Sequence, residues 1–266
     1  MNAGSPAARA GGGGALVVRR DPPRPRAAVL FLHGGRADAL EAPPALNAPG
    51  VRTALFASAL IRATRGDRIA VARVRYRHRG WNGTREDPVH DAREALGELV
   101  RRMGEVPVVL VGHSMGGRAA LRVAGRPQVC GVVALAPWCP PHEPVAQLRE
   151  RFVAVLHDQG DRVTSAEESW EFLERAAAAG ARTLGVRMPA GGHGMLRDAR
   201  TWHGVATSLA LGMLGLAPLP SALTGAAPGP VVLGPAALVR RHAGAPGGRG
   251  GDDEGCGGSA AAGRGG

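Results

Sequence analysis

The stretch VLVGHSMGG, residues 109–117, decides the fold that this sequence predicts. An apolar run typical of a buried strand ends in a serine flanked by glycines, with the spacing Gly112-x-Ser114-x-Gly116. Glycines at these two positions allow a strand to turn sharply into a helix with the serine at the tip of the turn. Because glycine supplies 41 of the 266 residues, the spacing also arises by chance, and its meaning depends on the rest of the chain.

Short apolar runs alternate with helical patterns on both sides of this stretch. Six runs have the length and composition of buried strands, namely 27–33, 69–74, 107–112, 129–136, 152–157 and 183–188. Helical patterns cover 50–64, 87–103, 115–125, 165–180 and a last segment from about residue 200. Apolar strands that alternate with helices imply a mostly parallel sheet covered on both faces. We therefore expect an α/β fold, with residues 15–19 as a candidate edge strand.

Two of the helical segments carry more specific expectations. In the segment 50–64, Val51, Leu55, Ala59 and Leu60 fall near one helical face, which predicts that they pack on the sheet. Ser165 and Glu168 have the spacing of a capping box, which predicts a helix start at this point.

The two ends of the chain differ in composition from its middle. Residues 1–14 are small and polar, and residues 217–266 are rich in Gly, Ala and Pro. Such segments bury too little apolar surface to offset the entropy of ordering, so we expect both to be disordered and residues 15–216 to form one domain. The uncharged stretch 204–239 is interrupted by prolines and glycines, which favours a terminal helix of the domain over a membrane span.

The net charge of +11 comes from 33 basic residues that are all arginine. These arginines are scattered, and no basic run is combined with stacking aromatics, so we expect no nucleic-acid partner. The three cysteines have neither zinc-site spacing nor an even number, and the first residues lack the apolar segment of a secretory signal. We expect a cytoplasmic protein without a membrane partner.

Short segments that contain histidine, serine or aspartate, each together with glycine, follow four of the predicted strands. They are His33-Gly34-Gly35, Gly112 to Gly117, His157 to Asp161, and Gly191 to Gly194 with His193 in its centre. In a parallel sheet the carboxyl ends of the strands meet at one edge, where ligands bind. A serine, a carboxylate and a histidine therefore emerge at the same edge.

These three residue types serve nucleophilic catalysis together. A serine hydroxyl needs a neighbouring base to remove its proton as it attacks. A histidine can take that proton and return it to the leaving group, and a carboxylate on its other ring nitrogen fixes the tautomer. A backbone amide at the helix N-terminus after Ser114 is placed to stabilise the developing oxyanion.

With these motifs the sequence resembles the α/β-hydrolase family over residues 15–216. The resemblance implies that Ser114 is the nucleophile, Asp161 the acid and His193 the base of a catalytic triad. It also implies that the amides of Gly35 and Met115 form the oxyanion hole, and that no cofactor is needed. No His, Cys, Asp and Glu cluster has ligand spacing, so we expect no metal.

Several assignments have alternatives within the sequence. Asp158 could take the role of Asp161, and His157 and His203 compete with His193 as the base. His33 and His113 flank the predicted site and are either structural or lining residues. Trp138, which follows the fourth strand, is a candidate pocket wall, although plain packing explains it nearly as well. Trp81 is a weaker candidate of the same kind.

The resemblance also restricts the kind of hydrolase. Epoxide hydrolases and haloalkane dehalogenases of the family carry aspartate at the position of Ser114. Only about 15 residues, 137–151, separate the fourth and fifth strands, which leaves no room for a cap domain. We expect a lidless serine hydrolase that cleaves an acyl ester or thioester of a small soluble substrate through an acyl-enzyme. A cofactor-free acyltransferase or perhydrolase would use the same triad, and a non-catalytic hydrolase-like binding protein is the alternative of another class.

Overall fold

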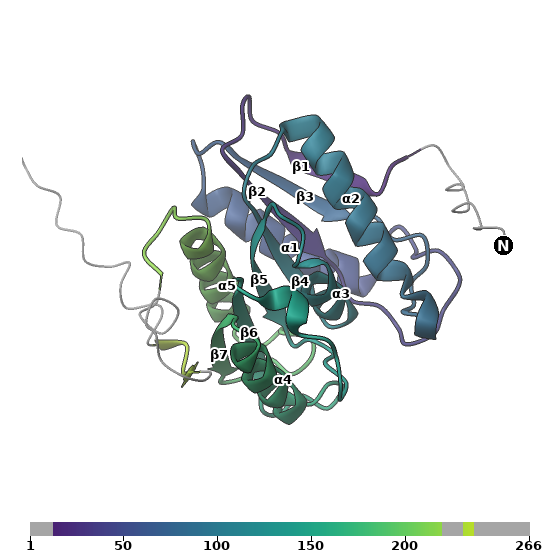
Figure 1. Cartoon of the computed structure of the whole chain (residues 1–266), viewed down its shortest axis with the longest axis vertical. Helices are drawn as coiled ribbons and strands as arrows, with labels where there is room; N and C mark the ends of the chain where they lie inside the picture. The colour runs from purple at the N-terminus through teal and green to yellow at the C-terminus, as the bar shows by residue number, and fades with distance from the viewer. Residues whose placement is uncertain (1–12, 220–230, 237–266) are drawn as a thin grey trace, which may run out of the picture.

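The computed structural model describes residues 13–219 and 231–236, and its helices and strands alternate along the chain (Figure 1). The strands are β1 (Leu16–Arg20), β2 (Ala27–Leu32), β3 (Ile69–Val74), β4 (Val108–His113), β5 (Val129–Leu135), β6 (Phe152–Asp158), β7 (Arg182–Met188) and β8 (Val231–Leu233). The α-helices are α1 (Ala48–Ala63), α2 (Asp87–Met103), α3 (Met115–Val123), α4 (Ala166–Ala178) and α5 (Ala199–Met213). Two short 3₁₀ turns, Gly83–Arg85 and Ala146–Leu148, complete the described elements.

All described strands belong to one sheet with the order β1-β3-β2-β4-β5-β6-β7-β8. Strand β1 runs antiparallel to β3, and every other neighbouring pair is parallel. The six parallel strands that the sequence predicts are confirmed, and the candidate edge strand at 15–19 is β1. All carboxyl ends of β2 to β7 therefore point to the same edge.

Helices cover both faces of this sheet, which explains why its central strands are apolar throughout. Strand β4 sends Val108 and Leu110 to the face that packs on α2, α3 and α4, and Val109 and Val111 to the face that packs on α1 and α5. Figure 1 shows α2 in front of the sheet and α1 behind it. Two hydrophobic cores, one on each face, result from this alternation.

Helix α1 packs on the sheet through a different face from the one expected. It buries Thr53, Phe56, Ala57 and Leu60, whereas Val51 and Leu55 are 48% and 49% exposed. The prediction for Val51 and Leu55 is wrong because two overlapping sets of positions in this segment have helical spacing. The large side chain of Phe56 belongs to the set that is buried.

The starts of two other helices agree more closely with the sequence. Ser165 caps α4, because its Oγ accepts a hydrogen bond from the Glu168 amide at 3.1 Å. Helix α2 begins at Asp87, whose carboxylate accepts hydrogen bonds from Arg85 and Asn82, and Glu86 precedes it with a left-handed backbone. Both predicted starts are therefore correct to within one residue.

Strand β8 lies in the segment 217–266 that the sequence predicts to be disordered. It pairs with β7 through Val231, Val232 and Leu233, so the prediction does not hold for these residues. The remainder of the predicted tail beyond 236, and most of the segment 1–14, lie outside the described residues. Helix α5 accounts for the first part of the uncharged stretch 204–239. Among the described residues, no helix combines the length and the hydropathy needed to cross a membrane.

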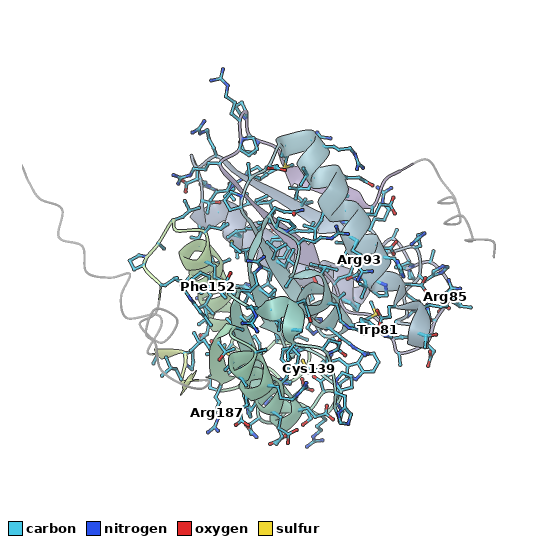
Figure 2. The ribbon with its side chains drawn as sticks, viewed as in Figure 1. Trp81, Arg85, Arg93, Cys139, Phe152 and Arg187 are labelled. Carbon is cyan, nitrogen blue, oxygen red and sulfur yellow. The ribbon has the colours of Figure 1, made fainter. Side chains whose placement is uncertain are left out.

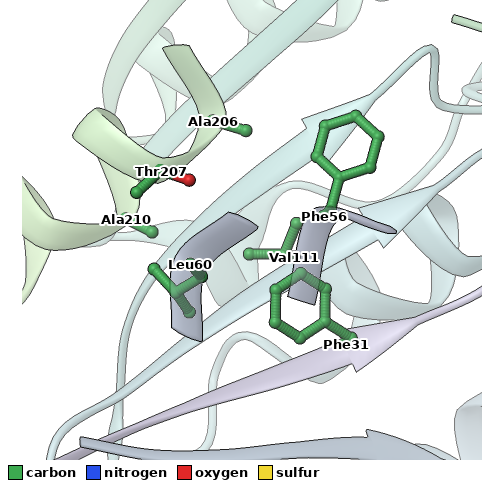
Figure 3. A pocket seen from close by; sticks show the side chains of 7 residues that line it. All are labelled: Phe31, Phe56, Leu60, Val111, Ala206, Thr207 and Ala210. Carbon is green, nitrogen blue, oxygen red and sulfur yellow. The ribbon is translucent and has the colours of Figure 1, made fainter. Parts of the chain in front are cut away.

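A small cavity separates α1 and α5 where both cross the sheet (Figure 3). Its volume is about 10 Å³, and its lining is apolar apart from one threonine: Phe31, Phe56, Leu60, Val111, Ala206, Thr207 and Ala210. A space of this size holds at most one water molecule, which would need several polar partners. The cavity is therefore a packing defect of the core beneath the carboxyl edge of the sheet.

The turn from β4 into α3 is packed so closely that two of its positions admit only glycine. A Cβ atom on Gly112 would lie 2.4 Å from the carbonyl oxygen of Gly116. A Cβ atom on Gly116 would lie 2.4 Å from the carbonyl oxygen of Leu32 at the end of β2. Because these neighbours are backbone atoms, they cannot rotate away. Helix α3 therefore begins in direct contact with both strands.

Replacement of Gly116 by alanine should lower the free energy of unfolding by about 1–3 kcal/mol, since the added methyl group overpacks this contact. The matched control is Gly204→Ala, on the exposed side of α5 with no atom within 4 Å of its Cβ position. Alanine there should stabilise the helix by about 0.5–1 kcal/mol. Urea denaturation measures both values, and equal effects of the two substitutions would contradict the packing described here.

Candidate active site

Ser114 occupies the tip of the turn between β4 and α3 in a strained backbone conformation. Its φ of 54° and ψ of −121° are unusual for a residue with a side chain. The amide of Ser114 donates to the Leu135 carbonyl at 3.0 Å, and its carbonyl accepts from Arg118 and Trp138. Strain of this kind costs about 1–3 kcal/mol and persists only where the surroundings impose it. The hydroxyl is thereby held at the carboxyl edge of the sheet.

A continuous row of hydrogen bonds joins Ser114, His193 and Asp161. His193 Nε2 lies 3.0 Å from Ser114 Oγ, and His193 Nδ1 lies 2.9 Å from Asp161 Oδ2. Because the carboxylate can only accept, the proton of the neutral ring sits on Nδ1 and Nε2 is free to accept from the serine hydroxyl. The structure thus brings together the three residues that the sequence singles out, from the ends of β4, β6 and β7.

The carboxylate of Asp161 is fully buried and kept ionised by its partners. Burial by itself raises its pKa, but hydrogen bonds from the Val163 amide, from His193 and from the Thr164 amide outweigh burial and lower it. The Val163 amide donates to Oδ1 at 2.8 Å, and the Thr164 hydroxyl donates to Oδ2 at 3.1 Å. An acid in this environment carries its negative charge at neutral pH, as the partner of His193 requires.

A second histidine, His157, contacts the same carboxylate from behind. Its Nε2 lies 3.3 Å from Asp161 Oδ2, and its Nδ1 lies 2.9 Å from the hydroxyl of Ser169 on α4. The ring is fully buried, and burial lowers its pKa although the charge of Asp161 acts in the opposite direction. His157 is therefore a neutral donor that orients Asp161. His193, and not His157, contacts the Ser114 hydroxyl, so the sequence alternative of His157 as the catalytic base is not supported.

Asp158 and His113 hold the loop that carries His193. Asp158 Oδ2 accepts from the Gly192 amide at 2.7 Å, and its Oδ1 accepts from the Gly160 amide. His113 Nε2 lies 3.0 Å from the His193 carbonyl oxygen, so this nitrogen carries the proton. Asp158, the alternative acid in the sequence, thus contacts the backbone of the histidine loop, and Asp161 contacts its ring.

The amides expected to form the oxyanion hole lie on two adjoining segments. Met115 begins α3, and a Cβ atom on Gly35 would lie 2.4 Å from Met115 Cε and 2.3 Å from the Arg79 carbonyl. The loop after β2 therefore packs directly on Met115, which brings the two residues next to each other and to Ser114. Among the hydrogen bonds of the described residues, none uses the amide of Gly35 or of Met115 as donor. Both are available to an incoming oxygen atom.

The three candidate pocket residues occupy different positions. His33 and His113 are 5% and 2% exposed, and His33 packs edge-on against Tyr76, which favours the structural alternative for both. The ring of Trp138 lies under the guanidinium of Arg118, which also covers the ring of Trp81 at 3.8 Å. Trp81 is labelled in Figure 2. Trp138 stays partly exposed, and its amide donates to the Ser114 carbonyl at 3.3 Å.

Exposed arginines are spread over the surface of the molecule. Arg187, on β7, lies far from Arg85 and Arg93 in the view of Figure 2. Arg118 and Arg122 instead point inward and pair with the buried carboxylate of Glu143, which fastens the loop between β5 and β6 onto α3.

Comparison with known proteins agrees with this architecture. A sequence model of the family described as serine aminopeptidase, S33, matches residues 75–159, less than half of the chain. The matched part contains the turn at Ser114 and ends before Asp161 and His193. A comparison with curated protein sequences finds no match.

Solved structures extend the likeness to most of the chain. The α/β-hydrolase enzyme MGS-M1 from a Medee basin deep-sea metagenome library has a TM-score of 0.59 at 17% identity, over 76% of this chain and 93% of that one. A lidless α/β serine hydrolase from Xanthomonas campestris has a TM-score of 0.52 at 17% identity, over 72% and 84%. An esterase domain from Rhodothermus marinus has a TM-score of 0.51 at 20% identity, over 75% and 91%. The chain has the α/β-hydrolase fold.

Within the described residues no insertion between β5 and β6 forms a cap domain, as the sequence predicts. The connection between β5 and β6 runs from residue 136 to residue 151 and contains only the 3₁₀ turn Ala146–Leu148. Ser114 nevertheless is only 8% exposed, because the surrounding loops approach it closely. Two side chains on the loops of the acid and the base, Val163 and Leu196, are 69% and 72% exposed and form part of the rim.

The described residues of the α/β-hydrolase fold contain no group of three or more His, Cys, Asp or Glu side chains that could hold a metal ion. The polar groups at the carboxyl edge instead contact and hydrogen-bond to one another. Asp161 is shared between two histidines, and Asp158 is occupied by two amides.

The buried histidines should make the stability of the protein depend on pH. Burial lowers the pKa of His33, His113, His157 and His203, that of His113 to about 3. The unfolded chain takes up protons at these rings as pH falls below about 6.5, and the folded chain does not. The stability that His113 contributes is therefore complete above pH ~6.5 and is lost as pH falls toward 3, by up to about 1.4 kcal/mol per pH unit, and the other rings act in the same direction.

Urea denaturation at several pH values between about 4 and 8 measures this dependence. The substitution His113→Gln should reduce the slope by about one proton, because the ring that resists protonation is gone. His90→Gln, on the exposed side of α2, is the control that keeps the slope of the wild type. A His113→Gln protein with an unchanged slope would refute the assignment of a neutral, buried His113.

Proposed function

We propose that the protein is a serine hydrolase that cleaves an acyl ester or thioester of a small substrate. The observation that carries this proposal is the row of hydrogen bonds from Asp161 through His193 to Ser114, with distances of 2.9 and 3.0 Å. Its members are held by separate elements, and their tautomer and charge suit proton transfer from the serine hydroxyl. The likeness to an esterase domain and to a lidless serine hydrolase agrees with this chemistry.

The proposed reaction proceeds in two halves. Ser114 Oγ attacks the acyl carbonyl carbon while its proton passes to His193 Nε2, and the resulting oxyanion binds the amides of Gly35 and Met115. The tetrahedral intermediate then expels the alcohol or thiol, which takes the proton from His193 and leaves an acyl group on Ser114. A water molecule next gives a proton to His193 and attacks the acyl carbon. Collapse of the second intermediate releases the carboxylic acid and returns the proton to Ser114.

The elements around Ser114 favour a small acyl group. The short connection between β5 and β6 adds no second domain that could enclose a long chain. A lipase-like interfacial activation needs a lid that moves, and this connection is pinned to α3 by the buried Glu143. We therefore assign short acyl esters or thioesters as substrates, and the aqueous cytoplasm as the compartment.

A fluorophosphonate probe tests the nucleophile. We expect the probe to label Ser114 in the folded wild-type protein, because the neighbouring base activates this hydroxyl. Mass spectrometry of the labelled peptide identifies the residue, and Ser114→Ala and His193→Ala should abolish labelling. Absence of labelling in a folded wild-type sample would remove the basis for a serine hydrolase.

The two aspartates at the end of β6 provide a matched pair of substitutions. Asp161→Asn should lower kcat by about 10⁴-fold, because the amide no longer stabilises the charged His193 ring or fixes its tautomer. Asp158→Asn removes the charge and one of the two acceptors for the Gly192 and Gly160 amides, without touching the His193 ring, and should cost less than about tenfold. Hydrolysis of 4-nitrophenyl acetate measures both, and equal losses would show that Asp161 is not the acid of the triad.

The acyl-chain preference can be measured with 4-nitrophenyl esters of increasing acyl length. The value of kcat/KM should be highest for short acyl groups, because the lidless site offers little enclosed apolar surface for a long one. A maximum at long chains would contradict this assignment, while leaving the role of Ser114 intact.

A further inference from the structure

Arg52, in the second turn of α1, is a half-buried cation without a partner. Its Nε is buried, and the described residues provide no hydrogen bond, ion pair or aromatic face for its guanidinium. Seven arginines of the described chain form ion pairs with carboxylates, and Arg52 is not among them: Arg26, Arg77, Arg79, Arg85, Arg102, Arg118 and Arg122. A buried donor without an acceptor opposes folding, so its presence calls for a compensating role.

The position of Arg52 places its charge beside the triad. Helix α1 follows β2, so its first turns lie at the carboxyl edge of the sheet, where Ser114 is located. An Nη2 atom of Arg52 lies 3.6 Å from the point that a Cβ on Gly194 would occupy, and Gly194 directly follows His193. Burial is the main cause of the low pKa of His113, and the charges of His193 and then of Arg52 lower it further. The guanidinium is therefore within electrostatic reach of the histidine loop.

Exposed apolar side chains surround this cation. Val51 and Leu55, on the same helix, are 48% and 49% exposed. Leu196 is 72% exposed, and its Cγ lies 3.4 Å from the same point above Gly194. A cation next to apolar groups is less screened by water, which strengthens its attraction for an anion. Aliphatic surface and one guanidinium together match a ligand that has a short carbon chain and a terminal carboxylate.

We propose that Arg52 binds a carboxylate carried by the ester substrate, a few bonds away from the carbonyl that Ser114 attacks. This inference rests on the proposed serine hydrolase function and names its substrate class, a carboxylate-bearing acyl ester or thioester. A planar guanidinium pairs with a carboxylate through two parallel hydrogen bonds. The guanidinium lies against Gly194, which directly follows the histidine that contacts Ser114, so a carboxylate held there would lie near the reacting carbonyl.

A carboxylate fits this position better than a phosphate. One guanidinium neutralises a single negative charge, and the atoms nearest to this point above Gly194 belong to Arg52 and Leu196 alone. A phosphate carries more charge and more acceptor oxygens, which usually require several donors. The positive net charge of +11 would in addition raise the local concentration of anionic substrates.

Matched pairs of esters test the proposal and locate the carboxylate. In one pair, mono-4-nitrophenyl glutarate is compared with 4-nitrophenyl pentanoate, which has the same number of acyl carbons but no charge. In the other pair, 4-acetoxybenzoate is compared with phenyl acetate, so that the charge is on the leaving group. We expect the wild type to favour the anionic member of at least one pair in kcat/KM. Arg52→Met should reduce that preference about tenfold or more while the neutral rate stays within about twofold.

Two further variants control for charge and for structure. Arg62→Gln removes a charge from the exposed last turn of the same helix and should leave the preference unchanged. Arg52→Lys keeps the charge without the fork and should retain part of the preference. Arg52→Met should keep or raise the melting temperature of the wild type, because it removes a buried donor that has no acceptor among the described residues. An unchanged preference in an active Arg52→Met protein would overturn the role of Arg52 and leave the hydrolase proposal standing.

Binding of a product-like probe tests the anion site at Arg52 separately from the hydrolase proposal, because it needs no ester cleavage. Disodium glutarate, at matched ionic strength, should raise the melting temperature of the Ser114→Ala protein through binding to the folded state. The double variant Ser114→Ala, Arg52→Met should lack this shift. Equal shifts in both proteins would overturn the anion site, whatever the outcome of the activity measurements.

Discussion

The close contact of α3 with the ends of β2 and β4 is the constraint on which the rest of the site depends. Gly116 touches the backbone of Leu32, and Gly112 touches the backbone of Gly116, with no space for a Cβ atom at either glycine. This contact forces Ser114 into its positive φ and starts α3 directly behind it. It also brings the loop after β2, with Gly35, onto Met115. One packing arrangement thus sets the direction of the hydroxyl and the positions of two free amides.

The acid end of the triad depends on a different feature, a buried carboxylate that accepts several hydrogen bonds. The side chain of Asp161 is fully buried, and its two oxygens accept hydrogen bonds from amides, a hydroxyl and His193, with His157 in contact at 3.3 Å. The hydrogen bonds from the Val163 amide, His193 and the Thr164 amide stabilise the charged carboxylate, which explains why its pKa is lowered in spite of burial. Asp158 and His113 fix the neighbouring loop by its backbone. The position of the His193 ring is therefore fixed both by its contact with Asp161 and by the contacts of its loop backbone.

The elements that the sequence predicts best are those with a strong local signal. Apolar runs of strand length mark β2 to β7, and the order Ser114, Asp161, His193 follows from the rule that carboxyl ends of parallel strands meet at one edge. What depends on contacts between distant residues is not visible in the sequence. His157 contacts Asp161 only because the loop after β6 folds back toward that strand. The lack of a partner for Arg52 Nε among the described residues depends on the positions of all its neighbours, which the sequence does not give. The buried face of α1 was predicted wrongly because two apolar patterns overlap, and β8 is a three-residue strand in a Gly- and Pro-rich segment.

The central claim is that Ser114 becomes acylated during turnover. The most direct measurement is rapid acid quenching of a reaction with 4-nitrophenyl acetate, followed by digestion and mass spectrometry of the peptides. We predict an initial burst of 4-nitrophenol and an acetyl group on the peptide that contains Ser114, at that serine alone. Turnover of the ester by the folded protein without acetylation of Ser114, or with the acetyl group on another residue, would contradict it.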